Sequence, residues 1–135
     1  MQTTALLLQE SDIRPSAQRV AVLGYLRSVK THPSIDTIYQ ALLPKIPGLS
    51  RTTVYNTLEL LVSHNLALSL DFGEGYLRYD GCTAPHSHFK CTCCGCVMDI
   101  DGVPENCEAL APKGAQVKSA SLYLFGKCPR CANPR

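Results

Sequence analysis

Residues 50–64 have the sequence SRTTVYNTLELLVSH, and this segment is the most informative one for predicting the fold. Ser50 is a favoured helix N-cap and apolar residues recur after it at helical spacing, so the pattern predicts a helix from Arg51 to about His64. Its apolar side consists of Val54, Leu58, Leu61 and Val62. Its opposite side is rich in groups that contact bases and phosphates, and carries Arg51, Thr52, Tyr55, Asn56 and Glu59.

Two further helices are expected before this stretch. The first opens at Ser16, and its apolar stripe consists of Val22, Leu23, Leu26 and Val29. The second has Ser34 as its N-cap and ends before Pro44, with inward-facing Ile35, Ile38 and Leu42. After Asn65 the pattern changes to alternation, and a glycine-rich turn at residues 71–75 leads into Tyr76–Tyr79, which predicts a hairpin.

Helices followed by a hairpin describe a winged helix, with residues 50–64 as the recognition helix. The alternative is a helical bundle that carries an additional hairpin. The polar side of the predicted helix favours the winged helix, in which Tyr55 and Asn56 face the major groove, Arg51 and Arg19 hold phosphates, and Thr52 also contacts DNA. The fold class is therefore α+β.

Composition and charge agree with a small DNA-binding protein. The chain has 135 residues, enough for one domain or two small ones, and its net charge is only +2. Residues 14–58 hold six basic residues and one acidic residue, a local charge of +5. Residues 5–8 are apolar but Glu10 and Asp12 follow and no basic region precedes them, so we expect a short amphipathic helix, no signal peptide and a cytoplasmic protein without membrane association.

Eight cysteines in a reducing compartment indicate metal ligation. Cys91 and Cys94, together with Cys128 and Cys131, form two Cys-x-x-Cys pairs that can hold one structural Zn²⁺. Cys93 and Cys96 have the same spacing, but Gly95 favours Cys91 and Cys94, because glycine commonly follows the second cysteine of a zinc knuckle. Cys82, Cys93, Cys96 and Cys107 are then expected to be buried or incidental thiols.

A redox dithiol at Cys128 and Cys131 is the competing interpretation. It requires a helix that lowers the thiol pKa, and since only four residues follow Cys131 we expect none. An enzyme is also not expected, because the chain has no His-Glu-x-x-His motif for zinc hydrolysis.

The second half of the chain is expected to be a small unit that needs a metal to stabilise it. Residues 81–85 resemble a hinge, and strands are expected near 88–91, 97–100 and 116–125, with a short helix near 104–110. His86 and His88 alternate on the first of these strands and point the same way. With Asp80, Asp99 and His32 they could form a nitrogen and oxygen site for iron, manganese or zinc. His32 is equally consistent with helix capping, and His64 is expected at a helix end.

These residues together resemble the ferric uptake regulator (Fur) family over essentially the whole chain. The matching segments are Pro15–Arg19, His32–Ser34, Ile38–Tyr39, Thr52–Leu58, Asp71–Gly73, His86–Cys91 and the final Cys-x-x-Cys. The resemblance implies a homodimeric repressor that binds a double-stranded DNA operator. Its winged helix would occupy residues 1–80, its hinge 81–85 and its metal-binding dimerisation domain 86–135.

The resemblance also assigns a regulatory Fe²⁺ or Mn²⁺ to His32, Asp80, His86, His88 and Asp99. Aspartate at positions 80 and 99, and Asn56 in the recognition helix, resemble the peroxide-sensing (PerR) branch. That branch implies release of DNA when iron catalyses oxidation of His32 or His86. The alternative is an iron- or zinc-responsive uptake regulator without peroxide chemistry.

Overall fold

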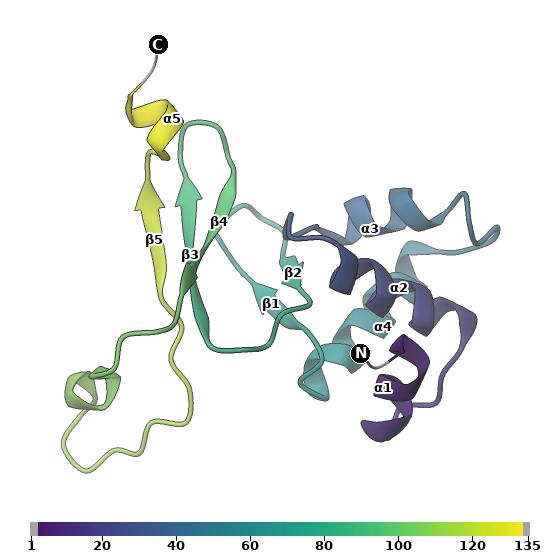
Figure 1. The fold of residues 1–135 in the computed structure, drawn as a ribbon, viewed down its shortest axis with the longest axis horizontal. Helices are drawn as coiled ribbons and strands as arrows, with labels where there is room; N and C mark the ends of the chain where they lie inside the picture. Colours follow the sequence, from purple (N-terminus) through teal and green to yellow (C-terminus); the bar gives the residue numbers. More distant parts are fainter. Residues whose placement is uncertain (1–2, 134–135) are drawn as a thin grey trace. The chain divides into compact units, whose positions relative to one another are not determined.

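The computed structural model describes residues 3–133, which form two compact units (Figure 1). The first unit ends at Thr83 and the second begins at Ala84. This boundary falls within residues 81–85, where a hinge is predicted. Among the described residues, none of the helices is both long enough and apolar enough to cross a membrane.

The first unit contains four helices, each with a side-chain cap. They are α1 (Thr4–Glu10), α2 (Ala17–Ser28), α3 (Ile35–Leu42) and α4 (Arg51–Ser63). The predicted N-caps Ser34 and Ser50 are confirmed, and Ser16, where the first of these helices was expected to open, is also an N-cap, since each hydroxyl accepts a hydrogen bond from the amide three residues later. The short helix expected at residues 5–8 is α1.

The predicted apolar sides of these helices form one core. Val22 and Leu26 of α2 are buried together with Ile38 of α3 and Val54 of α4. The polar side of α4 is exposed, as predicted, which leaves Arg51, Thr52, Tyr55, Asn56 and Glu59 at the surface. The period of the apolar residues is thus sufficient to orient all three helices.

A hairpin follows α4 and completes the winged helix. Strand β1 (Leu68–Leu70) pairs antiparallel with β2 (Arg78–Asp80). The second strand starts at Arg78, later than the predicted Tyr76, because Arg78 pairs with Leu70, the last residue of β1. In the turn before it, Glu74 accepts hydrogen bonds from Arg78 at 2.8 and 2.9 Å and from Tyr76 at 2.8 Å, which stabilise the turn.

The second unit is built on a three-stranded sheet in the order β4-β3-β5. The central strand β3 (His86–Cys91) pairs antiparallel with β4 (Val97–Asp101) and parallel with β5 (Tyr123–Gly126). The prediction of a strand over residues 116–125 is mostly wrong, since pairing with β3 begins only at Tyr123. The helix expected near 104–110 is a single 3-10 turn, η1 (Cys107–Leu110).

A short helix closes the described part of the chain. Helix α5 (Pro129–Ala132) begins directly after Cys128, which is its N-cap residue. The expectation that no helix lies here was wrong. Proline at the first helical position is compatible with a helix start because it needs no amide hydrogen bond there.

Candidate functional site

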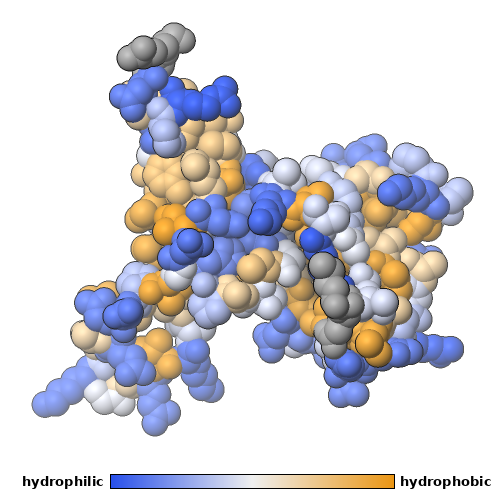
Figure 2. All heavy atoms as spheres, viewed as in Figure 1, coloured by the Kyte–Doolittle hydropathy of each residue, from blue (hydrophilic) through white to orange (hydrophobic). Residues whose placement is uncertain are grey.

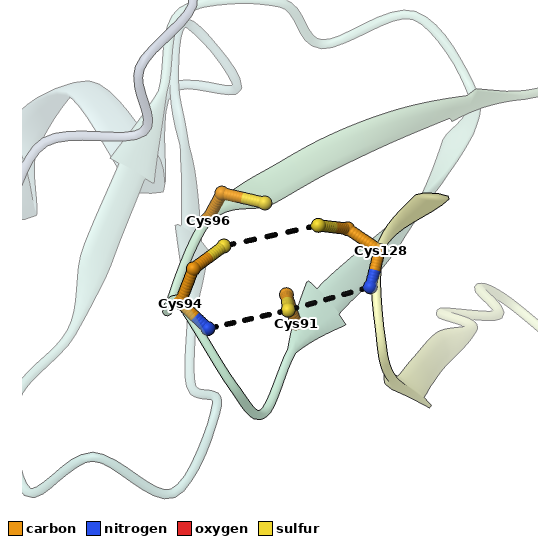
Figure 3. Close-up of side chains that lie close together, drawn as sticks. All are labelled: Cys91, Cys94, Cys96 and Cys128. Atoms are coloured by element: carbon orange, nitrogen blue, oxygen red, sulfur yellow. Dashed lines mark hydrogen bonds between the residues drawn. The ribbon is translucent and has the colours of Figure 1, made fainter. Parts of the chain in front are cut away.

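Four cysteine thiols gather at one end of the three-stranded sheet (Figure 3). The sulfur atoms of Cys91, Cys94, Cys96 and Cys128 all lie within 4.8 Å of one another. The Cys94 and Cys128 sulfurs are 3.8 Å apart. A tetrahedral Zn²⁺ with Zn–S bonds of about 2.3 Å requires sulfurs separated by about 3.8 Å. The cluster therefore fits a zinc ion.

Backbone amides around Cys91 favour its thiolate. The amides of Cys94 and Cys128 each donate a hydrogen bond to the Cys91 sulfur at 3.3 Å. These donors lower the pKa of Cys91 to about 5. The chain turns back at Gly95, whose φ of +81° lies in the left-handed region that glycine tolerates. Because the thiolate is the form that binds metal, this turn prepares Cys91 as a ligand.

The fourth position of the site differs from the sequence-based assignment. Cys96, which was expected to be incidental, belongs to the group of four, whereas Cys131 does not. The Cys131 thiol nevertheless interacts with members of the group and with Cys93, and its hydrogen bond with Cys128, more than those with Cys93, Cys91 and Cys94, raises its pKa. The pKa of Cys128 is lowered chiefly by the backbone amide of Cys131 in α5. The helix that the redox interpretation requires thus lowers the pKa of Cys128 and does not lower that of Cys131.

The second unit also brings two histidines and a carboxylate together. His86 and His88 lie on the same face of β3, with ring centroids 4.5 Å apart, and Asp99 is the partner of His88 on β4. The Asp99 carboxylate is 3.6 Å from His86 Nε2 and 3.5 Å from His88 Nε2. His86 Nδ1 lies 2.7 Å from the Ala84 carbonyl oxygen. A proton on Nδ1 would leave the Nε2 lone pair for a metal.

The first unit holds a separate pair of candidate ligands. His32 Nε2 is 3.4 Å from Asp80 Oδ2, and both side chains are buried. His32 has a φ of +55° and Ser34 caps α3, so the interpretation of His32 as a helix cap was wrong. The Cys82 amide donates to the other carboxylate oxygen of Asp80 at 2.9 Å, which fixes its orientation. A buried imidazole beside a buried carboxylate suits a divalent metal.

His64 has the role expected of it. It is the C-cap residue of α4, and its Nδ1 lies 2.9 Å from the Leu60 carbonyl oxygen. It therefore belongs to the helix end and contributes nothing to either ligand group.

Two of the candidate DNA-binding residues, Arg19 and Asn56, border the same pocket of the first unit. This pocket lies between the start of α2 and α4 and is lined by Arg14, Pro15, Ser16, Gln18, Arg19, Thr53, Asn56 and Thr57. Tyr55 is 44% exposed on the same helix. Arg51 makes two hydrogen bonds to Asp36, at 2.7 and 3.0 Å, and its guanidinium lies 4.4 Å from the centroid of the Tyr39 ring. Sequence reasoning missed this ion pair because its partners are 15 residues apart.

Comparison with known proteins agrees with this arrangement. The profile of the ferric uptake regulator family matches residues 10–125. The peroxide operon regulator of Bacillus subtilis (strain 168) is 36% identical over 129 residues, which cover 93% of this chain and 88% of that protein. The peroxide-responsive repressor PerR of Staphylococcus aureus (strain Mu50 / ATCC 700699) is 35% identical over 127 residues, covering 92% and 86%.

Solved structures share the fold. The Helicobacter pylori ferric uptake regulator has a TM-score of 0.76 at 24% identity, covering 95% of this chain and 88% of that chain. PerR from Streptococcus pyogenes has a TM-score of 0.56 at 28% identity, covering 97% and 94%. The predicted α+β fold class is confirmed, and the relatives named here are regulators, in keeping with the expectation that this protein is not an enzyme. The match over residues 10–125 shows that this chain belongs to the ferric uptake regulator family.

Proposed function

We propose that this protein is a metal-dependent repressor that binds operator DNA as a homodimer in the cytoplasm and releases it on exposure to peroxide. The observation that carries the proposal is a set of nitrogen and oxygen ligands on each unit. His32 and Asp80 are paired in the first unit, and His86, His88 and Asp99 are grouped in the second. Relatives named for peroxide regulation, 35–36% identical, support this choice within the family.

The regulatory ligands link the two units. An ion that binds His32 and Asp80 together with His86, His88 and Asp99 requires one particular arrangement of the units. Metal occupancy then selects the arrangement that fits DNA, and loss of the metal releases it. Five such ligands suit Fe²⁺ or Mn²⁺, which accept nitrogen and oxygen donors.

Peroxide acts on the ligands themselves. Bound Fe²⁺ supplies the one-electron reduction of hydrogen peroxide, which Mn²⁺ does not readily supply. In the net reaction, the C2–H carbon of the His32 or His86 imidazole gains one oxygen atom and becomes a carbonyl, while its hydrogen moves to the ring nitrogen. The ring loses two electrons, and peroxide gains them and leaves as water. The oxidised ring is a poorer ligand, so the two units are no longer held in the DNA-binding arrangement.

The structural zinc is a separate part of the proposal. Cys91, Cys94 and Cys128 supply three thiolates, and the sequence assigns Cys131 to the fourth position. Binding would join the β3–β4 turn to the start of α5, which stabilises a unit with few buried apolar side chains.

DNA contact is assigned to α4 and the start of α2. Tyr55, Asn56 and Thr52 are exposed on α4 and can reach base edges in the major groove. Arg19 borders the same pocket as Asn56 and can hold a phosphate, as can Arg51, whose ion pair with Asp36 is exposed and therefore weak.

The sheet of the second unit supports a homodimer. Phe89 is the register partner of both Met98 and Leu124, so the three side chains form a row across one face. Met98 is 43% and Leu124 44% exposed. Apolar side chains gather over this sheet at the surface (Figure 2). A second copy of the chain can cover such a row.

One experiment tests the mechanism. Protein is loaded anaerobically with Fe²⁺ or Mn²⁺, exposed to hydrogen peroxide, and measured for operator binding and by mass spectrometry of the peptides that contain His32 and residues 86–88. We expect one added oxygen and loss of operator binding only in the iron form. Unmodified histidines with unchanged binding would instead indicate an uptake regulator. Cysteine oxidation with loss of zinc would place the sensor at the thiol site.

A further inference from the structure

The thiolate site contains more cysteine thiols than one zinc ion can bind. Cys91, Cys94, Cys96 and Cys128 already form a complete group of four, and Cys131 lies against Cys128 from α5. Zinc in a structural site takes four ligands in a tetrahedron. At least one thiol is therefore always in excess when a single zinc ion is bound, so two cysteines can compete for one position.

Cys96 is held in place by the sheet. The Cys91 amide donates a hydrogen bond to the Cys96 carbonyl oxygen at 2.9 Å, which extends the β3–β4 ladder one step beyond the Lys90 and Val97 pair. Cys91 and Cys96 thus face each other across the two strands, and residues placed in this way have their side chains on the same side. The thiol of Cys96 therefore lies beside that of Cys91 because of strand pairing, and it does not depend on a flexible loop.

Cys131 approaches the same group from another element. It lies on α5, where its amide and thiol both contact the Cys128 sulfur. Cys91 is fixed by two amide hydrogen bonds, and Cys94 lies 3.8 Å from Cys128. These three sulfurs are common to both possible sets of four. Only the fourth position can be filled in two ways.

We propose that Cys96 and Cys131 are alternative fourth ligands of the structural zinc. The inference rests on the zinc site of the proposed function and adds a ligand to it. With Cys131 bound, zinc ties α5 to the sheet. With Cys96 bound, three ligands come from residues 91–96, the fourth is Cys128 at the start of α5, and no residue inside α5 binds the metal. Zinc is then retained when either cysteine alone is lost.

The test compares Cys96→Ser, Cys131→Ser and the double variant in the full-length protein. Cys91→Ser is the reference for a lost ligand. Cys107→Ser is the matched control, since its thiol bonds to the Pro104 carbonyl oxygen, within the η1 region. Zinc content is measured after challenge with a chelator. Cobalt is then substituted for zinc, because the intensity of its thiolate charge-transfer absorption scales with the number of bound sulfurs.

We expect both single variants to retain zinc and to show the four-thiolate cobalt spectrum of the wild type. The double variant should lose zinc to the chelator as Cys91→Ser does, whether or not it stays folded. If either single variant loses zinc as readily as Cys91→Ser, or if the double variant retains it, the exchange of ligands is overturned. A wild-type protein without thiolate-bound zinc would contradict the zinc site of the proposed function itself.

Discussion

Gly81 lies so close to the backbone of α2 that it has no space for a side chain. A Cβ atom at this position would be 2.8 Å from the Leu26 carbonyl oxygen and 2.9 Å from its carbon. Because backbone atoms cannot swing aside, we expect Gly81→Ala to lower the free energy of unfolding by about 1–3 kcal/mol. Urea unfolding of the metal-loaded protein, followed by helical circular dichroism, measures the change.

Gly24 is the matched control for this substitution. It lies within α2, and its Cβ would meet only the Thr4 hydroxyl, at 3.7 Å. Gly24→Ala should therefore stabilise the helix by about 0.5–1 kcal/mol. If both alanine variants shift stability in the same direction, the close approach of Gly81 to Leu26 is not what constrains that position.

Single residues also show where sequence reasoning stops. Spacing pointed to Cys91, Cys94 and Cys128, which the structure groups together, because a knuckle and its glycine are local patterns. It offered Cys96 only as a partner of Cys93 and Gly95 argued against that pair, whereas hydrogen bonding between β3 and β4 places Cys96 in the group. His32 is a similar case. Its neighbours along the chain suggested a helix cap, whereas its position beside Asp80 results from the fold of the whole first unit.

At the scale of one element, a residue of α4 is expected to determine sequence specificity, and a residue of α2 is expected to determine general DNA affinity. Asn56 is exposed and borders the same pocket as Arg19, so the two can contact the same stretch of DNA in different ways. We expect Asn56→Arg to change which operator sequence is preferred, because a base contact is altered. Arg19→Ala should weaken binding to every sequence alike and reduce the salt dependence by about one phosphate contact. Binding assays over a set of operator variants distinguish the two outcomes, and a uniform loss for Asn56→Arg would contradict its role in specificity.

The wing depends on an ion pair within its own turn. Glu74 and Arg78 are only 15% and 18% exposed, and Glu74 accepts both hydrogen bonds of the guanidinium, which raises the Arg78 pKa. Glu74→Gln removes the charge, and we expect it to cost about 1–3 kcal/mol of stability in thermal or urea unfolding.

The ion pair between Asp36 and Arg51 provides the comparison. Both side chains are more than half exposed, so Asp36→Asn should cost about 0–1 kcal/mol. Equal losses of stability for the two substitutions would show that the burial of the Glu74 and Arg78 pair does not increase its contribution to stability.

Elements with their own start signals were predictable from the sequence, and elements defined by a partner were not. Serine caps and apolar periodicity located α2, α3 and α4 to within a residue or two. Strand β5 was predicted seven residues too early, because its start is set by where β3 offers hydrogen-bonding partners. Residues 116–122, in which polar and apolar side chains largely alternate, precede the first residue that is in register with β3.

At the scale of the whole molecule, the proposed function requires coupling between two units that each hold some of the proposed ligands. If one ion uses ligands from both, the factor by which manganese raises operator affinity must equal the factor by which the operator raises manganese affinity. Manganese is the suitable ion for this measurement because its form should be insensitive to peroxide. Titrations of metal with and without operator, and of operator with and without metal, give the two factors.

Substitutions in either unit should reduce this coupling equally. Asp80→Asn weakens the pair with His32 in the first unit, and Asp99→Asn weakens the group with His86 and His88 in the second. Both should bring the coupling factor close to one while the zinc content stays unchanged, since neither residue belongs to the cysteine cluster. Glu108→Gln, an exposed change in η1, should leave the factor as it is. If Asp80→Asn leaves the coupling intact while Asp99→Asn abolishes it, the regulatory ion uses ligands of the second unit alone, and control of DNA binding must then act through the homodimer.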